Sequence, residues 1–512
     1  MTLNVTVTGD ITVDWIQWPV KEDADVSRFN WKSHLGFKRK ALRGGALLLA
    51  DMLSTSLRVN HPELEVEPEN TDPSEFIHSF AELEDSGKGY HVKRFLGYTG
   101  PEDGLPGMPF KFRDSEADVL VIDDAGNGFR EMNDKWPSSL RNEETLIVLK
   151  MSSPLFTGSL WRYLAENHRE NLITIVTVDD LREFGANISR RLSWEKTAED
   201  FMWQMNNNPA MADLRDLNMV VRIGLEGAVH YSGGDARLFY HPHLFEGNLF
   251  ERSPGKMQGY GCAFTAGFTE SICRGHDIDD AVRSGMTASM NLHRKGFTRK
   301  PDYPLNIFKA GDISWIGSVK IPHQGRELWT IADSPPIFDI ESVSRHIVIN
   351  GYRQRRCPLP IAHFGKLITA DRTEIEGYQS IRNLMIEYLK TENPERPLCI
   401  GVFGPPGAGK SFAVKQLAAS VDPERIEHLN FNISQFRDEE DLIDAFHQID
   451  REVLNAFLKI PEYRHGVRSM EAILDMSILQ DVKRFEKSSL PPAGQLDLHV
   501  DGELFHRMVM EN

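Results

Sequence analysis

The stretch that decides the fold of this chain is Gly259-Tyr260-Gly261-Cys262-Ala263-Phe264-Thr265-Ala266-Gly267. Its glycines allow a sharp backbone turn that presents bare N–H groups at the start of an expected helix, Ala263–Cys273. The dipole of that helix favours negative charge at its first turn. The stretch therefore predicts a strand-to-helix turn with an anion hole at Gly259 and Gly261.

Apolar runs typical of buried strands alternate with segments of helical spacing around this stretch. The expected strands are Asn4–Val7, Val119–Ile122, Thr145–Leu149, Leu172–Val178 and Met219–Ile223. The expected helices include Leu42–Leu57, Leu160–Asn167 and Ile375–Leu389. This alternation predicts an α/β sheet with crossover helices over residues 1–300. We expect residues 301–395 to be a connector with short strands and a helix, and residues 396–512 to be a second domain.

Composition narrows the class of protein. The 512 residues suffice for about three domains, and the 40% of hydrophobic residues excludes wholesale disorder. The net charge of −17, from 58 Lys+Arg and 75 Asp+Glu, gives no footprint for nucleic acid or for an anionic membrane. No apolar run approaches the roughly 18 residues of a membrane span. Four cysteines without a CxxC pair favour a reducing compartment, so we expect a soluble, cytoplasmic protein.

A family resemblance covers roughly residues 1–296. The residues that carry it, in chain order, are Gly9-Asp10-Ile11-Thr12-Val13-Asp14, Gly44-Gly45, Ile223-Gly224-Leu225-Glu226-Gly227-Ala228-Val229 and Gly259–Gly267. Together they resemble ribokinase-like (PfkB) carbohydrate kinases, which implies a three-layer α/β/α fold. The resemblance further implies a sugar or nucleoside site at Asp14, Gly44 and Gly45, and a nucleotide turn at Gly224 and Gly227. The chain departs from the family pattern after Gly45 and at Lys256-Met257-Gln258.

The most consequential departure is Cys262, which stands where these kinases carry a catalytic Asp. A kinase of this kind needs a carboxylate there to accept the proton of the attacking hydroxyl. A thiol has a reference pKa of about 8.5, which the helix N-terminus would lower somewhat. The sequence therefore favours a pseudokinase that binds a sugar or nucleoside without phosphorylating it. Three alternatives stay open: an active sugar or nucleoside kinase, a scaffold with vestigial sites, and a plain strand-to-helix turn.

A second phosphate-binding motif follows an expected buried strand, Leu398–Phe403. The segment Gly404-Pro405-Pro406-Gly407-Ala408-Gly409-Lys410-Ser411 matches the Walker A (P-loop) pattern Gly-x-x-x-x-Gly-Lys-Ser/Thr and precedes an expected helix, Ser411–Ala419. In such a loop the backbone N–H groups hold the α/β-phosphates, Lys410 reaches the β/γ-phosphates, and Ser411 binds Mg²⁺. We therefore expect ATP and Mg as ligands of this segment.

The amino-acid sequence of this loop is similar to that of the P-loop in AAA+ ATPases. Ile426–Ile433 with Ser434-Gln435-Phe436 looks like their second strand and turn, and Gly466-Val467-Arg468, before a helix at Ser469–Leu479, resembles their lid. The resemblance implies that Arg468 touches the γ-phosphate, and it implies homo-oligomerisation, because AAA+ relatives form rings.

The strands that complete such an ATPase are missing from the sequence. Residues 438–460 carry a helical apolar stripe instead, and the acids Glu439-Glu440-Asp441 stand at its start, where helices favour negative charge. No apolar run after the loop ends in an acidic pair. We expect an incomplete P-loop α/β domain with a helical lid, which binds phosphate with little or no hydrolysis.

Two other features, a histidine cluster and a stretch rich in Asp and Gly, give weaker signals. His241-Pro242-His243, with His230 nearby, lacks a Cys or carboxylate at ligand spacing, which favours ordinary structure over a metal site. Asp123-Asp124-Ala125-Gly126-Asn127-Gly128 ends an expected strand and fits a binding loop or an ordinary turn equally well.

Overall fold

The computed structural model describes residues 3–21, 35–72, 75–99, 105–112, 114–126, 128–249, 258–308, 316–323, 329–334, 340–351, 359–391, 397–403, 405, 407, 409–422, 426, 451–477 and 487–510. The chain divides into two compact units, Met1–Pro423 and Glu424–Asn512. The division into three parts at residues 300 and 395 stays a prediction.

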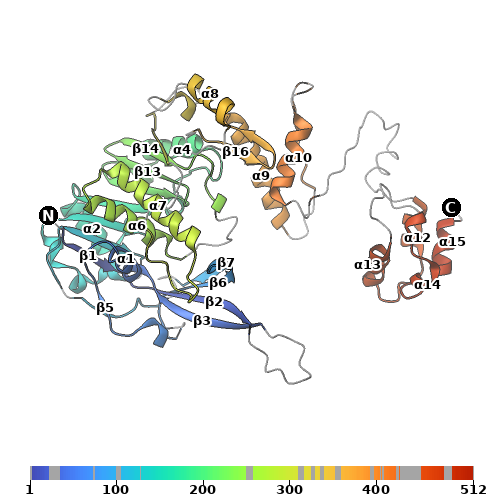
Figure 1. Ribbon diagram of the computed structural model, residues 1–512, viewed down its shortest axis with the longest axis horizontal. Helices are drawn as coiled ribbons and strands as arrows, with labels where there is room; N and C mark the ends of the chain where they lie inside the picture. Colours follow the sequence, from blue (N-terminus) through green and yellow to red (C-terminus); the bar gives the residue numbers. More distant parts are fainter. Residues whose placement is uncertain are drawn as a thin grey trace. The chain divides into compact units, whose positions relative to one another are not determined.

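A nine-stranded sheet forms the centre of the first unit (Figure 1). Its strands are β1 (Val5–Gly9), β4 (Val59–Asn60), β9 (Val119–Asp124), β10 (Leu146–Met151), β11 (Leu172–Thr177), β12 (Asn218–Ile223), β13 (Gly227–Ser232), β14 (Asp235–Tyr240) and β15 (Gly317–Lys320). Their order is β15-β14-β13-β12-β11-β10-β9-β1-β4. The strands from β4 to β12 in this order pair in parallel, and β13, β14 and β15 continue antiparallel. All five strands predicted within residues 1–300 belong to this sheet.

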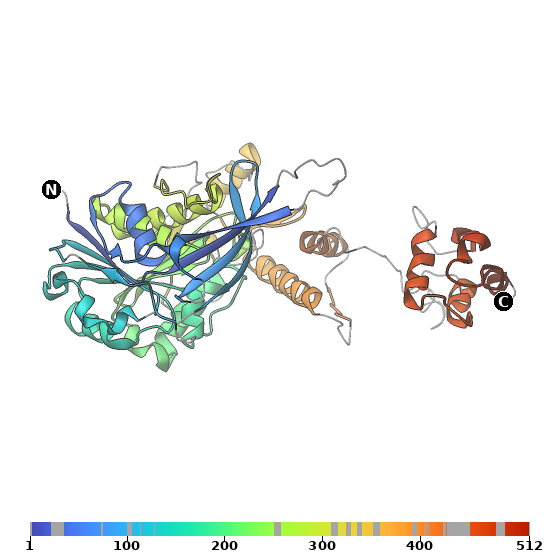
Figure 2. The same cartoon turned by 90° about the horizontal axis from the view of Figure 1, so that it is seen from below.

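Helices cover both faces of the sheet (Figure 2). One face carries α1 (Gly45–Leu53), α6 (Tyr260–Cys273) and α7 (Ile278–Lys295), and the other carries α2 (Gly158–Asn167) and α4 (Trp194–Asn207). Because helices cover both faces, the central strands β1 and β9 are buried along their whole length. The predicted α/β sheet with crossover helices is confirmed.

Just after β1 the chain enters a smaller, four-stranded sheet. It consists of β2 (Val13–Lys21), β3 (Leu35–Arg43), β6 (His78–Asp85) and β7 (Tyr90–Tyr98), in the order β3-β2-β6-β7. The predicted helix over 42–57 is wrong at its start, because Leu42 pairs with Asp14 between β3 and β2. A two-stranded pair, β5 (Glu63–Leu64) with β8 (Phe110–Lys111), lies apart from both sheets.

After β15 the first unit continues as a helical extension that contacts α4. It contains α8 (Ile340–Asn350), the hairpin β16 (Ala362–Phe364) and β17 (Leu367–Thr369), α9 (Arg372–Lys390) and α10 (Lys410–Val421). Buried Arg372 binds Glu199 of α4 at 2.6 Å, and α10 packs on α9 and the hairpin. The helix predicted over Ile375–Leu389 is confirmed as α9.

The second unit is a small helical bundle. Its helices are α12 (Arg451–Lys459), α13 (Val467–Met476), α14 (Ala493–Leu496) and α15 (Gly502–Met510). Val453, Phe457 and Phe505 belong to its own apolar core. The predicted strand Ile426–Ile433, the turn after it and Glu439–Asp441 lie outside the described residues, Ile426 excepted. Within the described ranges, no helix has the length and apolar character needed to cross a membrane.

Candidate functional site

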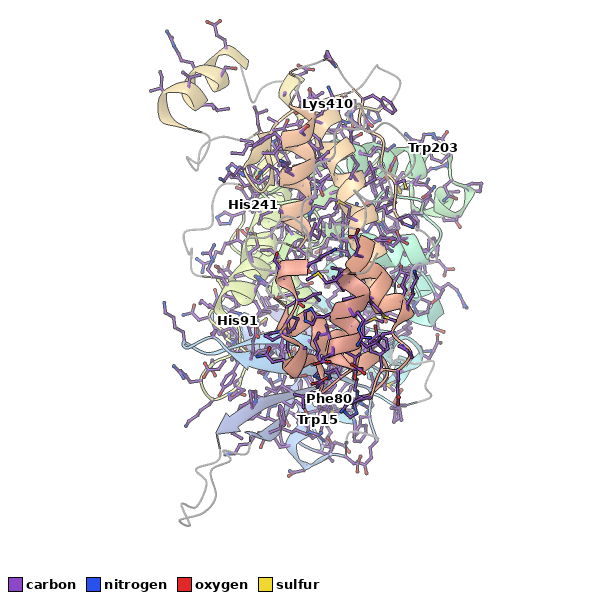
Figure 3. All side chains as sticks on the ribbon, turned by 90° about the vertical axis from the view of Figure 1, so that its right-hand side faces the viewer. Trp15, Phe80, His91, Trp203, His241 and Lys410 are labelled. Carbon is purple, nitrogen blue, oxygen red and sulfur yellow. The ribbon has the colours of Figure 1, made fainter. Side chains whose placement is uncertain are left out.

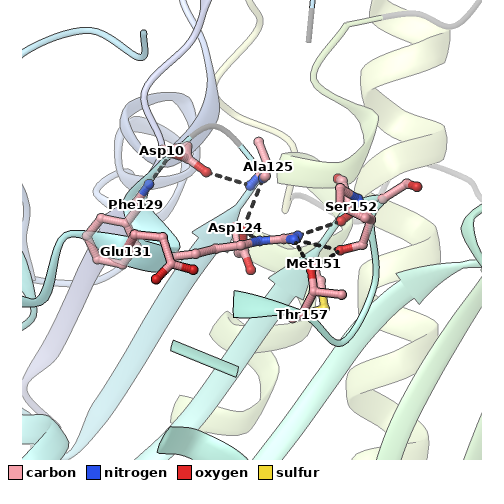
Figure 4. A network of polar contacts seen from close by, with 12 residues as sticks. Asp10, Asp124, Ala125, Phe129, Glu131, Met151, Ser152 and Thr157 are labelled. Carbon is pink, nitrogen blue, oxygen red and sulfur yellow. Dashed lines mark hydrogen bonds and ion pairs between the residues drawn. The ribbon is translucent and has the colours of Figure 1, made fainter. Parts of the chain in front are cut away.

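The carboxyl ends of β1, β9 and β10 are tied together by buried polar contacts (Figure 4). The carboxylate of Asp10 accepts the N–H groups of Ala125 at 2.9 Å and Phe129 at 3.0 Å. Arg130 donates to Asp124 Oδ1 at 2.7 Å and to the Ser152 carbonyl at 2.9 Å. These bonds hold the loop after β9 against the ends of its two neighbours, so Asp10 and Asp124 support the edge on which the candidate site lies.

The predicted ligand residues Asp14, Gly44 and Gly45 meet at this edge. Asp14 Oδ1 accepts the Ser79 hydroxyl at 2.8 Å, and Oδ2 accepts the Tyr303 hydroxyl at 2.6 Å. A Cβ on Gly44 would lie 2.3 Å from Thr12 Oγ1 and 2.9 Å from Asp14 Cγ, so only glycine leaves room for this carboxyl group. Burial raises the pKa of Asp14, although both hydroxyl bonds oppose the rise.

The helix after the predicted glycine turn begins three residues before the predicted Ala263, and residues 251–257, where the expected strand would end, lie outside the described residues. Gly259 caps the helix with φ +84°, a left-handed conformation that favours glycine, and the helix begins at Tyr260. Gly261 and Cys262 lie in its first turn. Cys262 is buried, with Sγ 3.5 Å from the Gly45 carbonyl and 3.6 Å from Asp123 Oδ2. The structure therefore joins the predicted anion hole, Cys262 and the predicted ligand residues in one place.

The expectation that the helix N-terminus lowers the pKa of Cys262 is wrong. Burial, followed by the negative charge of Asp123, raises the pKa of the Cys262 thiol. Desolvation opposes the thiolate, and Lys150 nearby counteracts this only in part. Cys262 is therefore a protonated thiol at neutral pH.

Sequence reasoning missed two basic side chains here, Lys150 and Arg222. Lys150 Nζ lies 2.5 Å from Asp123 Oδ1, and Asp123 is fully buried. Burial, the largest single cause, lowers the pKa of Lys150, but the charge and the hydrogen bond of Asp123, together with Cys262, leave the pKa raised. Arg222 stands in β12 with its guanidinium over the Phe264 ring, 5.3 Å from the ring centre. A basic residue inside or just after an apolar strand was the available signal for both.

The predicted nucleotide turn, Gly224 and Gly227, joins β12 to β13. Gly224 has φ +60°, and Glu226 Oε2 accepts the N–H of Leu225 at 2.9 Å inside the turn. A Cβ on Gly227 would lie 2.4 Å from the Trp194 ring, which explains this glycine by close packing. A nucleotide contact at Gly224 and Gly227 stays a prediction.

The P-loop segment differs from its prediction. The helix predicted over Ser411–Ala419 is confirmed as α10, but Leu398–Phe403 forms no strand, and Phe403 is 94% exposed. An apolar run becomes a buried strand only when neighbouring strands pair with it, and the predicted second strand, 426–433, lies almost wholly outside the described residues. The described loop residues are Pro405, Gly407 and Gly409.

The structure does not bring the P-loop segment to the site at α6. Lys410 donates to the Pro405 carbonyl at 2.7 Å, and Ser411 is exposed. Lys410 and Trp15, whose carbonyl accepts Gln258 at 3.2 Å beside Asp14, lie at opposite ends of the first unit (Figure 3). Gly404 and Ala408 lie outside the described residues.

Three further predictions concern Arg468, the histidine pair and Mg²⁺ binding at Ser411. Arg468 is exposed in α13 of the second unit, and its contact with a γ-phosphate stays a prediction. His241 and His243 stack edge to face, with ring centres 6.3 Å apart. Among the described residues, no group of three or more His, Cys, Asp or Glu could hold a metal ion. Mg²⁺ at Ser411 would depend mainly on water and nucleotide oxygens, and stays a prediction.

Comparisons with protein-family models and with curated proteins give no match. Among solved structures, ribokinases and related carbohydrate kinases match about 60% of this chain. A carbohydrate kinase from Agrobacterium tumefaciens is 16% identical, with 60% of this chain and 95% of that chain covered and a TM-score of 0.32. Ribokinase from Cryptococcus neoformans var. grubii serotype A, in complex with ADP, is 14% identical, with 60% and 99% covered and a TM-score of 0.36. Arabidopsis thaliana ribokinase, complexed with ribose and ATP, is 12% identical, with 61% and 100% covered and a TM-score of 0.37.

Proposed function

We propose that residues 1–300 form a kinase-like domain that binds a sugar or nucleoside without phosphorylating it. The observation that carries the proposal is the buried thiol of Cys262 in the first turn of α6. The turn offers N–H groups to an anion, but phosphoryl transfer also needs a base for the attacking hydroxyl. A thiol whose pKa is raised by burial cannot accept that proton at neutral pH.

Asp14 is the residue proposed to hold the ligand. It is buried at the start of the small sheet, and Ser79 and Tyr303 each donate to one of its two oxygens. An ionised carboxyl group accepts up to about four hydrogen bonds, so each oxygen keeps a lone pair for a ligand hydroxyl. The hydroxyls of Ser79 and Tyr303 fix the direction in which Asp14 offers its remaining lone pairs.

A second candidate function is an active sugar or nucleoside kinase that uses Asp123 as its base. The observation that favours it is the 3.6 Å between Asp123 Oδ2 and Cys262 Sγ, which puts a carboxylate beside the expected position. The ion pair with Lys150 at 2.5 Å argues against it, because a carboxylate paired with an ammonium is a weaker base.

Phosphoryl transfer from ATP to a panel of sugars and nucleosides separates the two. We expect no transfer by the full chain, and a gain of transfer in Cys262→Asp if the anion hole and ligand site are intact. Transfer by the unchanged chain that Asp123→Asn abolishes would establish the second function and refute the first. Ligand binding by Asp14→Asn, measured by calorimetry with the same panel, should fall by at least about tenfold.

For residues 396–512 we propose nucleotide binding at the P-loop with little or no hydrolysis, in a regulatory role toward residues 1–300. The support is the match of Gly404–Ser411 to the motif and a helix that begins at Lys410 behind Gly409 in left-handed conformation. Calorimetry with ATP and ADP should show binding that Lys410→Ala weakens. ATP turnover at the rate of ordinary P-loop ATPases, lost in Lys410→Ala, would contradict the proposal.

A further inference from the structure

Residues 297–308, called the strap below, follow α7 and contact the small sheet. At one end the strap pairs with β7, where the N–H groups of Tyr90 and Phe297 donate to each other's carbonyl groups at 2.9 and 2.7 Å. At the other end the carbonyl of Ile307 accepts the side-chain N–H of Asn291 in α7 at 2.9 Å. The strap is therefore fixed at both ends, once to the small sheet and once to α7.

The middle of the strap is held by few contacts. Residues 298–308 contain no helix and no strand. Pro301 and Pro304, which flank Asp302 and Tyr303, carry no N–H group with which to join a sheet. Asp302 pairs with Lys40 of β3 at 2.5 Å, but both side chains are partly exposed, and such an ion pair adds little stability. The middle of the strap can therefore move without breaking a helix or a sheet.

Tyr303, in the middle of the strap, is buried inside the candidate site. Its hydroxyl donates to Asp14 Oδ2 at 2.6 Å, and burial raises its pKa, so it keeps the proton that it donates. Its ring reaches Gly259, where an added Cβ would lie 2.9 Å from Tyr303 Cε1. Tyr303 thus lies between the proposed ligand carboxylate and the turn at the start of α6. A ligand that reaches from Asp14 to this turn needs the space that Tyr303 fills.

The chain also supplies the hydrogen bond to the other oxygen of Asp14. The Ser79 hydroxyl donates to Asp14 Oδ1 at 2.8 Å, and Gln258 Nε2 donates to the Ser79 hydroxyl at 2.5 Å. Gln258 Oε1 is buried and has no hydrogen-bond partner among the described residues. A buried acceptor without a donor is unfavourable, so the arrangement with Tyr303 in place leaves one hydrogen bond of this network unmade.

We propose that the strap blocks the candidate site from within: the Tyr303 hydroxyl stands where a ligand hydroxyl would bind Asp14, and a sugar or nucleoside binds only after Tyr303 has moved out. This inference rests on the ligand-binding function proposed for the same site and adds its regulation. A phenol and a sugar hydroxyl donate the same kind of hydrogen bond to a carboxylate, so the exchange replaces one bond by its equivalent. The affinity for the ligand is then reduced by the small fraction of chains in which the strap is open.

Calorimetry with ribose and with adenosine compares the full chain with Tyr303→Phe. This variant keeps the ring and loses the bond to Asp14, which no longer favours the closed strap. We expect it to bind about tenfold more tightly, a factor that corresponds to one hydrogen bond to a charged group. Tyr163→Phe is the matched control, because its hydroxyl donates to the Leu140 carbonyl at 3.0 Å from α2, and it should leave the affinity unchanged.

Weaker binding by Tyr303→Phe would overturn the inference, because it would show that the hydroxyl only orients Asp14 for the ligand. The opposite signs of the two expectations separate a blocking role from a supporting one.

Hydrogen exchange of the strap amides gives a second measurement. The Thr298 amide donates to the Asp302 carbonyl at 3.0 Å within the strap. Saturating ribose or adenosine should make it exchange about tenfold faster, because the ligand holds the strap open. Lys40→Met, which releases Asp302, should speed the same exchange without a ligand. Slower or unchanged exchange in the ligand-bound chain overturns the inference, because a ligand beside a closed strap would protect it.

The inference and the proposed function fail separately. Phosphoryl transfer from ATP to ribose or adenosine by the unchanged chain overturns the proposed function, and tighter binding by Tyr303→Phe would still establish the block. Equal affinity of the unchanged chain and Tyr303→Phe, with binding lost in Asp14→Asn, overturns the block and leaves the proposed function in place. Absence of binding by the unchanged chain and by Tyr303→Phe overturns both.

Discussion

Two helices of the chain, α6 and α10, have a glycine in left-handed conformation as their N-cap residue. Gly259 caps α6 with φ +84°, and Gly409 caps α10 with φ +74°. Both sequences resemble phosphate-binding motifs. Their surroundings differ: α6 packs on α1, α7 and β10 and is buried on nearly every turn, whereas α10 buries Ala413, Leu417 and Ala418 alone.

The difference shows what makes such a turn a site. At α6 the first turn meets Asp123, Lys150 and Arg222, which come from three strands of one sheet. At α10 the preceding apolar run, Leu398–Phe403, forms no strand, and Phe403 is exposed. A short motif specifies a turn and a helix, but the charged groups around it come from distant parts of the chain.

The largest expected contrast is between the two lysines. Lys150→Met leaves the buried Asp123 carboxylate without its cation and should destabilise the first unit by about 3 to 5 kcal/mol. Lys410→Met, at the start of α10, should change stability by no more than about 0.5 kcal/mol. Native-state hydrogen exchange of the β9 and β10 amides measures both. Equal effects of the two variants would contradict the contrast.

The stability of the first unit is expected to depend on pH. Burial raises the pKa of Glu226, in the turn after β12, from 4.5 to about 7. The folded chain therefore binds this proton more tightly than the unfolded chain, and its contribution is complete below pH 4.5. Stability should fall by about 3 kcal/mol as pH rises to about 7.

Thermal unfolding of the first unit between pH 4.5 and pH 8 checks this dependence. Glu226→Gln should flatten the profile, whereas Glu387→Gln, at an exposed position of α9, should not change it. A profile as steep in Glu226→Gln as in the unchanged chain would assign the dependence to another group.

Replacing the N-cap glycines Gly259 and Gly409 by alanine should give a smaller difference in stability loss. Gly259→Ala strains the backbone and places its Cβ 2.9 Å from the Tyr303 ring, so we expect a loss of about 2 to 3 kcal/mol. Gly409→Ala has the same backbone strain, but its Cβ meets none of the described atoms within 4 Å, so we expect about 1 kcal/mol. Hydrogen exchange of the α6 and α10 amides measures each loss, and a larger loss at Gly409 would show that α10 is packed more closely than described.

The smallest effect is expected at Phe403. Its ring is 94% exposed, so Phe403→Ser should alter stability by less than about 0.5 kcal/mol. A buried strand over Leu398–Phe403 would instead make the change cost about 3 to 5 kcal/mol. Chemical denaturation followed by circular dichroism distinguishes these outcomes.

Local signals in the sequence predicted much of the fold. The runs Val119–Ile122 and Leu172–Val178 match β9 and β11 because strands covered on both faces must be apolar throughout. Leu42 was misassigned to a helix, because its pairing with Asp14 across β2 and β3 leaves no local periodic signal. Leu398–Phe403 was misassigned for the opposite reason: its apolar pattern is that of a strand, but no described strand pairs with it.

The glycines and the acidic residue Asp14 of the candidate site were predicted, but its basic residues were missed. Gly44 and Gly45 were named from the family resemblance, and Gly259 and Gly261 from the turn before an expected helix; in the structure, left-handed φ values or close approaches restrict these positions to glycine. Lys150 and Arg222 were missed because their importance depends on the spacing of β10 and β12 across the sheet.

The sequence by itself determined the alternation of strands and helices, the glycine-led turns, and the presence of a thiol at Cys262. The tertiary structure alone decided that this thiol is buried beside Asp123 with a raised pKa, and that Arg222 lies beside Gly261 and over the Phe264 ring. The physical reason is how far apart along the chain the interacting residues lie. Backbone conformation depends on neighbouring residues, whereas burial and charge pairing depend on residues that are far apart in the chain and meet only when the sheet forms.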